Sequence, residues 1–286
     1  MRGKNMSHNQ PLPRSFLYVP GDKPELFTKA SASGADAVVL DLEDAVASSQ
    51  KTAALNEVTK WISTAPDPEK CWVRVDPTLL AAQIPAVVEA GVSGIFLAKA
   101  AEETLDEADQ ILSACEESNK KIPVVGLVES ASALVQLGKL ASHPRLRTFG
   151  IGEVDLLADL AMNRSSHTES AITFLRSQIV IQCAAAGIHP PVAPTSTNFR
   201  DIQEFKTSTE AFVDLGFGAR TAIHPAQVEV INAAFTPTAD QIDEARDVLN
   251  RFISANEGVA VDRHGALIDA AVVRRAQRIL SRASSH

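Results

Sequence analysis

The sequence predicts an α/β protein built as a (β/α)8 barrel, with a helical extension at its C-terminal end. Three observations support this prediction. Eight short strand-like runs alternate with helical patterns along most of the 286 residues. Most of the runs are apolar throughout, as expected of parallel strands that are buried on both faces. Residues 237–286 continue beyond the eighth strand and its connection, which gives the extension.

The predicted strands are short and rich in apolar and β-branched residues, which favours strand over helix at these lengths. In chain order they are Phe16–Pro20, Ala37–Glu43, Cys71–Asp76, Gly94–Lys99, Pro123–Glu129, Thr148–Asp155, Pro191–Thr195 and Thr221–His224.

Helical patterns fill the segments between the strands. Pro24 suits the first turn of a helix, and Gly34, Gly91 and Gly187 suit helix ends. The clearest predicted helices within the barrel are Pro24–Ser33, Ser48–Thr64, Gln83–Gly91, Thr104–Asn119, Ala131–Ala141 and His167–Ala186. In the extension, Thr238–Asn256 and Ala270–Arg282 have the same character, separated by a stretch that contains glycine.

Strict alternation of strands and helices allows either an open doubly wound sheet or a closed barrel. An open sheet usually carries a G-x-G-x-x-G motif after its first strand, whereas Gly21-Asp22-Lys23-Pro24 stands there in this chain. The barrel is therefore favoured. We expect a flexible tail over residues 1–13, the barrel over 14–236, and over 237–286 a lid or an arm that reaches a neighbouring subunit.

The composition excludes several classes of protein. Hydrophobic residues make up 45% of the chain and charged residues 22%, which is typical of a globular protein. The net charge of −8, without a basic block, argues against a nucleic-acid partner. No apolar run is long enough to cross a membrane, and Met1–Pro13 lacks the apolar core of a secretion signal. Cys71, Cys115 and Cys183 match neither a disulfide framework nor zinc spacing, so we expect a cytoplasmic protein.

Two of the predicted strands end in an acid, Glu129 on the fifth and Asp155 on the sixth. The carboxyl ends of barrel strands form the active face. Mg²⁺ commonly takes one or two protein carboxylates and keeps its other positions for water or substrate oxygens. We therefore predict that Glu129 and Asp155 hold Mg²⁺, with Mn²⁺ as a substitute. Glu153 is an alternative to Asp155, since alternation along a strand would put both on the same face.

Other ionisable residues gather at the same predicted face. Arg74 is a charge inside an apolar strand, so it either pairs with a carboxylate such as Glu43 or binds a substrate carboxylate through its planar fork, and both can hold. Lys99 would give electrostatic support, or act as the Schiff-base lysine of an aldolase. The remaining members of this group are Asp41, Asp44, Asp76 and His224.

Such a site suits a particular chemistry. A 2-keto or 2-hydroxy acid offers two oxygens that can chelate the metal. The metal would then stabilise negative charge on the substrate while a carbon–carbon bond breaks or forms.

Several short motifs occur in a characteristic order and together resemble the citrate lyase beta-subunit-like branch of the HpcH/HpaI aldolase family. The resemblance spans roughly Arg14 to Leu280. The motifs are Arg14-Ser-Phe-Leu-Tyr-Val-Pro-Gly21, Val39-Leu-Asp-Leu-Glu-Asp-Ala-Val46, Val73-Arg-Val75, Glu129-Ser130, Gly152-Glu-Val-Asp-Leu156, Phe199-Arg-Asp201, Ala222-Ile-His-Pro-Ala-Gln227 and Leu267-Ile-Asp269.

This resemblance implies a (β/α)8 barrel, a homotrimer or larger homo-oligomer, and Mg²⁺-dependent chemistry on acyl-CoA esters. It implies Glu129 and Asp155 as metal ligands, with Glu129 also near the substrate. Arg74 would bind the substrate carboxylate and take part in catalysis together with Glu43, and Arg14 would lie close by and help to bind the substrate. Asp269 matches an acid that acts in a neighbouring subunit's site as general acid or base.

The sequence also departs from the family pattern at three places. Arg220 stands where relatives often have Lys, and Asp76 replaces a usual Asn. Gly152 and Asp155 are one residue further apart than in many relatives, which bears on the choice between Asp155 and Glu153.

We therefore expect a Mg²⁺-dependent lyase that cleaves or forms a 3-hydroxyacyl-CoA ester such as citryl-CoA or malyl-CoA, with an oxo acid and acetyl-CoA as the other side of the reaction. Three alternatives remain open at this point. They are a metal-dependent aldolase acting on free hydroxy-keto acids, a beta subunit of a citrate lyase complex acting on an acyl-carrier-protein thioester, and a barrel that only binds a metabolite.

Overall fold

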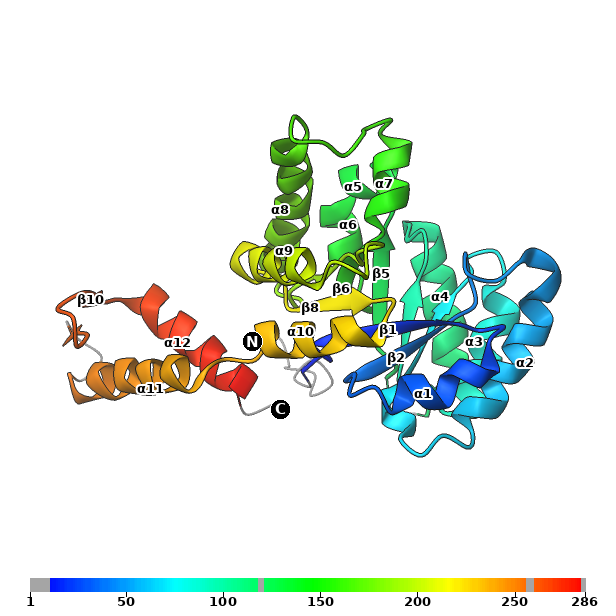
Figure 1. Ribbon diagram of the computed structural model, residues 1–286, viewed down its shortest axis with the longest axis horizontal. Helices are drawn as coiled ribbons and strands as arrows, with labels where there is room; N and C mark the ends of the chain where they lie inside the picture. Colours follow the sequence, from blue (N-terminus) through cyan, green and yellow to red (C-terminus); the bar gives the residue numbers. More distant parts are fainter. Residues whose placement is uncertain (1–10, 118–120, 256–259, 284–286) are drawn as a thin grey trace. The chain divides into compact units, whose positions relative to one another are not determined.

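A closed barrel of eight parallel strands forms the main body of the protein, which confirms the predicted fold (Figure 1). The computed structural model describes residues 11–117, 121–255 and 260–283. β1 pairs with β8 where the barrel closes, seen in Figure 1 as blue beside yellow. The strands are β1 (Ser15–Pro20), β2 (Ala37–Asp41), β3 (Cys71–Val75), β4 (Gly94–Leu97), β5 (Val124–Val128), β6 (Leu146–Ile151), β7 (Val192–Ala193) and β8 (Ala219–Ala222).

Helices surround the barrel on its outside (Figure 1). Gly91 and Gly187 end α3 and α8 in the left-handed conformation, with φ of 99° and 69°, as their positions in the sequence predicted. The helices of this body are α1 (Phe27–Ser31), α2 (Lys51–Ile62), α3 (Leu80–Ala90), α4 (Glu102–Cys115), α5 (Ala131–Val135), α6 (Leu137–Ala141), α7 (Glu153–Asp159), α8 (Glu169–Ala186), α9 (Ile202–Leu215) and α10 (Pro225–Phe235).

The interior of the barrel is filled by side chains. Phe16, Trp72 and Phe96 pack edge to face, with ring centroids 5.1–5.9 Å apart. A methyl group added at Gly94 would lie 2.2 Å from the Trp72 ring, so this position must be glycine. The packed centre is therefore a core, and active sites of such barrels lie at the end where the strands finish.

Several predicted strands are too long, and the sixth is wrong by the most at its end. The sixth was expected to run to Asp155, but β6 ends at Ile151 and α7 begins at Glu153. Gly152 leaves the strand conformation, with φ −88° and ψ 74°, and the next residues turn into a helix. Acidic residues are favoured in a first helical turn, which explains why Glu153 and Asp155 fit there.

β7 is shorter than predicted, and its ladder with each neighbouring strand is short. It spans only Val192–Ala193, and its recorded pairing with β6 is at a single position, Gly150 with Val192. Pro194 and the residues after it leave the sheet. Side chains hold the segment that follows β7: Arg220 Nε donates to the carbonyl oxygen of Pro194, and Gln227 Nε2 to that of Ser196, both at 3.1 Å.

By its internal contacts the chain divides into two compact units, Met1–Asn232 and Ala233–His286. The second unit contains α11 (Ala239–Ser254), β9 (Ala260–Val261), β10 (Leu267–Ile268) and α12 (Ala270–Ala283). Its small core includes Val248, Ile268 and Val273. The domain limits predicted from the sequence stay predictions, and residues 1–10 of the expected tail lie outside the described residues.

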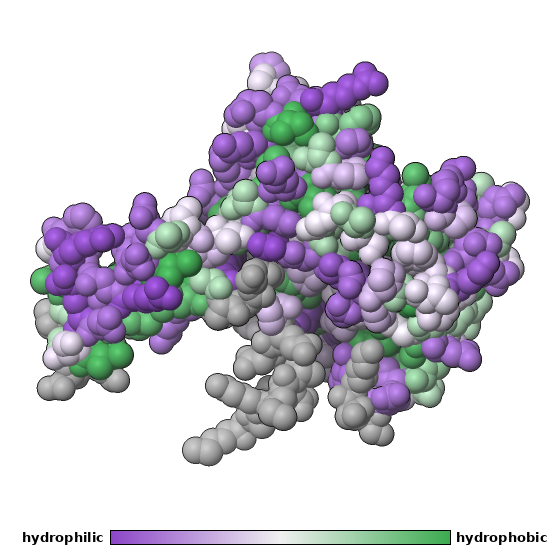
Figure 2. All heavy atoms as spheres, turned by 60° about the horizontal axis from the view of Figure 1, so that its bottom comes forward, coloured by the Kyte–Doolittle hydropathy of each residue, from purple (hydrophilic) through white to green (hydrophobic). Residues whose placement is uncertain are grey.

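The surface seen in Figure 2 is mostly hydrophilic, and its apolar residues are scattered in small groups. Within the described residues, no helix combines the length and the apolar character that crossing a membrane requires.

Candidate active site

A cavity of about 710 Å³ lies at the carboxyl ends of the strands, the face on which the sequence predicted the active site. Its wall brings together residues from seven of the strands or the loops that follow them, and from helices α7, α8 and α9. The ionisable residues that line it are Tyr18, Asp41, Asp44, Arg74, Glu129, Glu153, Asp155, Arg164, Arg176, Glu204 and Arg220.

Arg74 is held by acids on both sides of its fork. Its Nε donates to Oδ1 of Asp41 at 2.7 Å and its Nη2 to Oδ2 at 2.5 Å, while Nη1 lies 3.1 Å from Oε2 of Glu43. Burial opposes the charge on Arg74, but these acids outweigh it and keep the pKa of Arg74 above its ordinary value. The pairing with a carboxylate is therefore present, and the guanidinium also lines the cavity.

Glu43 joins Arg74 to Lys99. Its Oε1 accepts a hydrogen bond from Nζ of Lys99 at 2.7 Å, and this bond is the main reason that the pKa of Lys99 is raised. A lysine with a raised pKa stays protonated and is a poor Schiff-base nucleophile. Lys99 is thus placed for electrostatic support, the role that the sequence favoured.

Glu129 lies directly after β5 and is only 4% exposed. The backbone of Lys99 adopts the left-handed conformation, with φ 48°, and its N–H donates to Oε2 of Glu129 at 2.7 Å. Burial, and then the negative charges of Glu43 and Asp155, raise the pKa of Glu129 to about 7. A buried carboxylate among other acids is the electrostatic environment that a cation would relieve.

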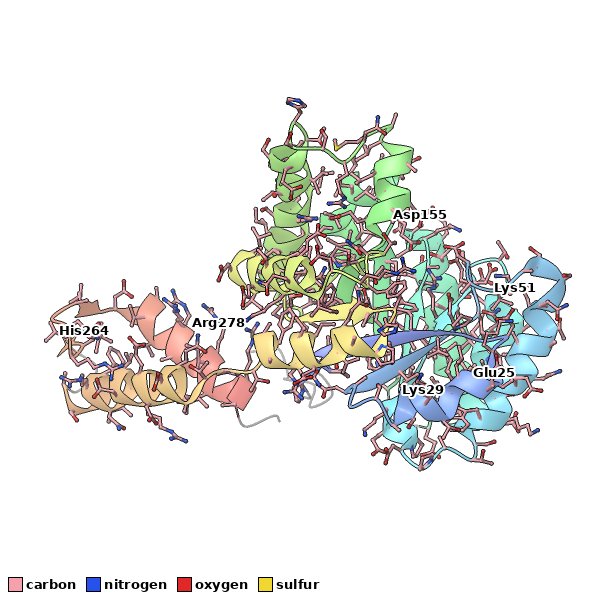
Figure 3. All side chains as sticks on the ribbon, in the orientation of Figure 1. Glu25, Lys29, Lys51, Asp155, His264 and Arg278 are labelled. Atoms are coloured by element: carbon pink, nitrogen blue, oxygen red, sulfur yellow. The ribbon has the colours of Figure 1, made fainter. Side chains whose placement is uncertain are left out.

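The side chains of Asp155 and Glu153 have different environments. The expectation that both lie on one face of a strand is wrong, because both belong to the first turn of α7, where residues two apart point in opposite directions. Asp155 is exposed and lines the cavity (Figure 3). Glu153 is 7% exposed and binds Arg176 through both oxygens, at 2.6 and 2.9 Å, and also Arg164.

Lys51 is a residue that the sequence analysis did not single out. From the start of α2 (Figure 3), its Nζ donates to the carbonyl oxygens of Leu42 and Glu43 at 2.9 and 2.7 Å, and pairs with Asp76 at 2.9 Å. The acid at position 76 thus anchors Lys51, which holds the acidic loop after β2. Only the packing of α2 against that loop reveals this role.

Arg14 lies at the other end of the barrel. It precedes β1, and its side chain pairs with Asp36, which precedes β2, at 2.8 Å. Both positions come before parallel strands, so they belong to the amino-terminal end. The structure therefore does not bring Arg14 to the cavity, and its role in substrate binding is a prediction that this placement does not support.

Asp269 lies at the start of α12 in the second unit. Its Oδ1 accepts hydrogen bonds from the N–H groups of Ala271 and Val272 at 2.8 and 2.9 Å. These bonds lower the pKa of Asp269, so that its exposed carboxylate is ionised near neutral pH.

The carboxylates at the cavity fit Mg²⁺ better than a metal that needs a full set of protein ligands. Within residues 11–117, 121–255 and 260–283, no group of three or more His, Cys, Asp or Glu side chains is arranged to hold a metal ion. Zinc and iron sites usually need such a group, whereas Mg²⁺ accepts one or two carboxylates. The pair Glu129 and Asp155 therefore matches the donor set of an open Mg²⁺ site.

Comparison with known proteins is consistent with this arrangement. The model of the HpcH/HpaI aldolase/citrate lyase family matches residues 14–225. The citrate lyase subunit beta of Leuconostoc mesenteroides is 28% identical, over 98% of this chain and 96% of that protein. A (3S)-malyl-CoA thioesterase of Cereibacter sphaeroides is 31% identical, over 97% of this chain and 95% of that protein.

A solved structure extends the likeness to three dimensions. The protein CitE of Mycobacterium tuberculosis, in complex with magnesium, acetoacetate and coenzyme A, superimposes with a TM-score of 0.71 and 27% identity. The match covers 96% of this chain and 98% of that one. The chain is therefore an enzyme of the HpcH/HpaI aldolase/citrate lyase family, as its motifs predicted.

Proposed function

We propose that this protein is a Mg²⁺-dependent carbon–carbon lyase that cleaves a 3-hydroxyacyl-CoA ester, such as citryl-CoA or malyl-CoA, into an oxo acid and acetyl-CoA, or runs the reverse reaction. The observation that carries the proposal is the pair Glu129 and Asp155 at a cavity that Arg74 also lines. The relative that binds magnesium, acetoacetate and coenzyme A supports the same assignment.

Glu129 and Asp155 would hold the metal, with Mn²⁺ as a substitute. A bound Mg²⁺ would supply positive charge that stabilises the negative charge developing on the substrate oxygens. Lys99 fixes Glu129 through its backbone N–H, and the acids around Arg74 fix the guanidinium in the wall. Arg74 can then orient a substrate carboxylate with the donors that its acid partners leave open.

Asp269 would transfer a proton to or from the methyl carbon of acetyl-CoA. In the condensation direction an ionised carboxylate can take a proton from the methyl group of acetyl-CoA, and in cleavage the resulting acid returns it to the enolate. The lowered pKa of Asp269 keeps it in the base form, which supports this role. We propose that it acts in the site of a neighbouring subunit, within a homotrimer or larger homo-oligomer.

The test is product analysis with the full chain. Citryl-CoA and malyl-CoA are incubated with the protein and Mg²⁺, and parallel samples contain EDTA. We expect acetyl-CoA and the matching oxo acid in equal amounts, only with metal. The absence of acetyl-CoA from every thioester tested, with Mg²⁺ or Mn²⁺, contradicts the proposal.

A thioesterase is the second candidate, because the relative with 31% identity is named a (3S)-malyl-CoA thioesterase. Hydrolysis would release free coenzyme A and an intact hydroxy acid instead of acetyl-CoA. The same assay run with free hydroxy-keto acids detects the aldolase alternative, and co-purification of other chains detects a lyase complex. A cytoplasmic location stays a prediction.

A further inference from the structure

The cavity extends past the end of β7, between the strands and the helix layer. On this side it is lined by Thr195 of the loop after β7, Arg176 of α8, Ser208 and Phe212 of α9, and Arg220 of β8. We call these five residues the side pocket. Strand β7 ends at Ala193, and the cavity reaches from the ends of the strands to the loop that follows β7 and to helices α8 and α9.

Arg220 is a buried cation whose recorded partners are all neutral. It is 2% exposed, and its guanidinium carbon lies 3.9 Å from the ring centroid of Phe205. Nε donates to the carbonyl oxygen of Pro194 at 3.1 Å, and Nη1 donates to that of Phe205 at 3.1 Å and to Oγ of Ser208 at 3.0 Å. Burial and the nearby charge of Arg176 lower the pKa of Arg220 to about 9. The positive charge is therefore present and without a carboxylate partner among the described residues.

Two donors in the side pocket lack an acceptor. Thr195 Oγ1 is buried and has no hydrogen-bond partner within the part of the chain that the structure describes. Over the same residues, no acceptor is recorded for Nη2 of Arg220. A buried polar group without a partner destabilises a fold, so natural proteins rarely keep one without a reason such as a ligand.

Arg176 is already paired with acids, so Arg220 carries the single uncompensated charge of the side pocket. Its Nε and Nη2 bind Glu153, its Nη1 binds Glu169 at 3.1 Å, and its guanidinium lies over the ring of Phe212. Arg176 is thus neutralised, and Arg220 carries the remaining charge. One positive charge and two donors match the single charge and two oxygens of a carboxylate, whereas the second negative charge of a phosphate dianion would be left uncompensated.

The side pocket and the proposed metal ligands line the same cavity. Glu129 packs so closely on Gly152 that a methyl group there would lie 2.4 Å from its Oε1. The next residue, Glu153, binds Arg176 of the side pocket. Gly152, which touches Glu129, and Glu153, which anchors Arg176 of the side pocket, are therefore consecutive in the chain.

We propose that the side pocket binds a second carboxylate of the acyl group, through Arg220 Nη2 and Thr195 Oγ1. The inference rests on the proposed lyase function and narrows its substrate class. The preferred thioester is one that yields an oxo acid with a carboxylate in addition to the one beside its keto group.

The test compares two stable hydroxy acids that differ by one carboxylate, (S)-malate and lactate. Their dissociation constants are measured by calorimetry on the full chain with Mg²⁺. We expect malate to bind at least about tenfold tighter than lactate, because a charge-assisted hydrogen bond contributes roughly 1.5–3 kcal/mol. Thr195→Val and Arg220→Lys should each reduce this ratio about fivefold or more, since Val removes the hydroxyl and Lys lacks the planar fork.

Thr221→Val is the matched control. Thr221 also lines the cavity, but its hydroxyl already donates to the carbonyl oxygen of Ala193 at 3.2 Å. This variant should lose stability and keep the malate to lactate ratio. Thr195→Val should keep or gain stability, because it removes a buried hydroxyl that has no partner.

Three results overturn the inference. The first is that the wild type binds malate and lactate equally, and the second is that both folded variants, Thr195→Val and Arg220→Lys, keep the malate to lactate ratio. The third is that the variants weaken the binding of coenzyme A and of neither acid. Failure of the lyase proposal is separate. It shows as no cleavage of any thioester, while the malate to lactate ratio still depends on Thr195 and Arg220.

Discussion

The surroundings of Glu129 disfavour the ionised form of its carboxyl group. Burial, and then the charges of Glu43 and Asp155, raise its pKa from the ordinary value of 4.5 to about 7. The folded protein therefore binds more protons than the unfolded chain between these two values. The stability that comes from this preference is complete below pH 4.5 and is lost as the pH rises through 7.

Glu129→Gln should consequently stabilise the metal-free protein at pH 8, by at most about 3 kcal/mol, and should have little effect near pH 4.5. Urea unfolding in EDTA at the two pH values measures the difference. Glu25→Gln, at an exposed position (Figure 3), is the control and should show no such pH dependence. A wild type that is more stable than Glu129→Gln at pH 8 would refute this account of Glu129.

Asp155 and Glu153 should respond differently to loss of charge. Asp155→Asn removes a proposed metal ligand and should weaken Mg²⁺ binding by at least about tenfold, since even partners outside the ligand set contribute 10–100-fold. Glu153→Gln leaves Arg176 with a poorer partner and should destabilise the fold by about 3 kcal/mol. Calorimetric titration with Mg²⁺ and urea unfolding report the two effects, and the reverse pattern would make Glu153 the ligand.

At this scale the sequence predicted the residues that end strands and missed those whose role depends on packing. Glu129 and Arg74 lie at the cavity because their places on β5 and β3 follow from the strand pattern. Arg14 precedes a strand, so its position belongs to the opposite end of the barrel. Arg176 could not be selected, and Arg220 could not be given a role, because nothing in the sequence says which face of α8 or which side of β8 meets the cavity.

Among the elements, the turn from β6 into α7 matters most for the site. Gly152 ends the strand, and Glu129 fills the space where a side chain would stand. Gly152→Ala should displace the Glu129 carboxylate and weaken Mg²⁺ binding at least about tenfold, while the barrel stays folded. Gly138→Ala is the control, because its methyl group would meet only the end of the Gln182 side chain, at 3.3 Å. Unchanged Mg²⁺ affinity in Gly152→Ala would show that this close packing does not position Glu129.

The strands were predictable because they are apolar on both faces and bounded by turn residues. The transition after Ile151 was not, because an apolar run that passes through glycine into two acids can continue as a strand or begin a helix. Only the glycine conformation and the contacts of Glu153 decide it.

For the whole molecule, the closed barrel followed from the number of βα units, whereas no pattern in one chain specifies how subunits meet. If Asp269 acts in a neighbouring site, equal mixing of Asp269→Asn and Glu129→Gln chains should restore about a quarter of wild-type activity, since a quarter of the shared sites would be intact. Each variant alone should be nearly inactive. Activity is measured after the mixed chains are refolded together, and no recovery would place Asp269 outside a shared site.

The central claim is that Glu129 and Asp155 bind the metal that the reaction needs. The most direct measurement is a crystal structure with Mn²⁺ and oxaloacetate, in which anomalous scattering locates the ion. We predict an ion in contact with a carboxylate oxygen of Glu129 and one of Asp155, with oxaloacetate bound to it. An ion bound to Glu153, or one that contacts neither Glu129 nor Asp155, would contradict the claim.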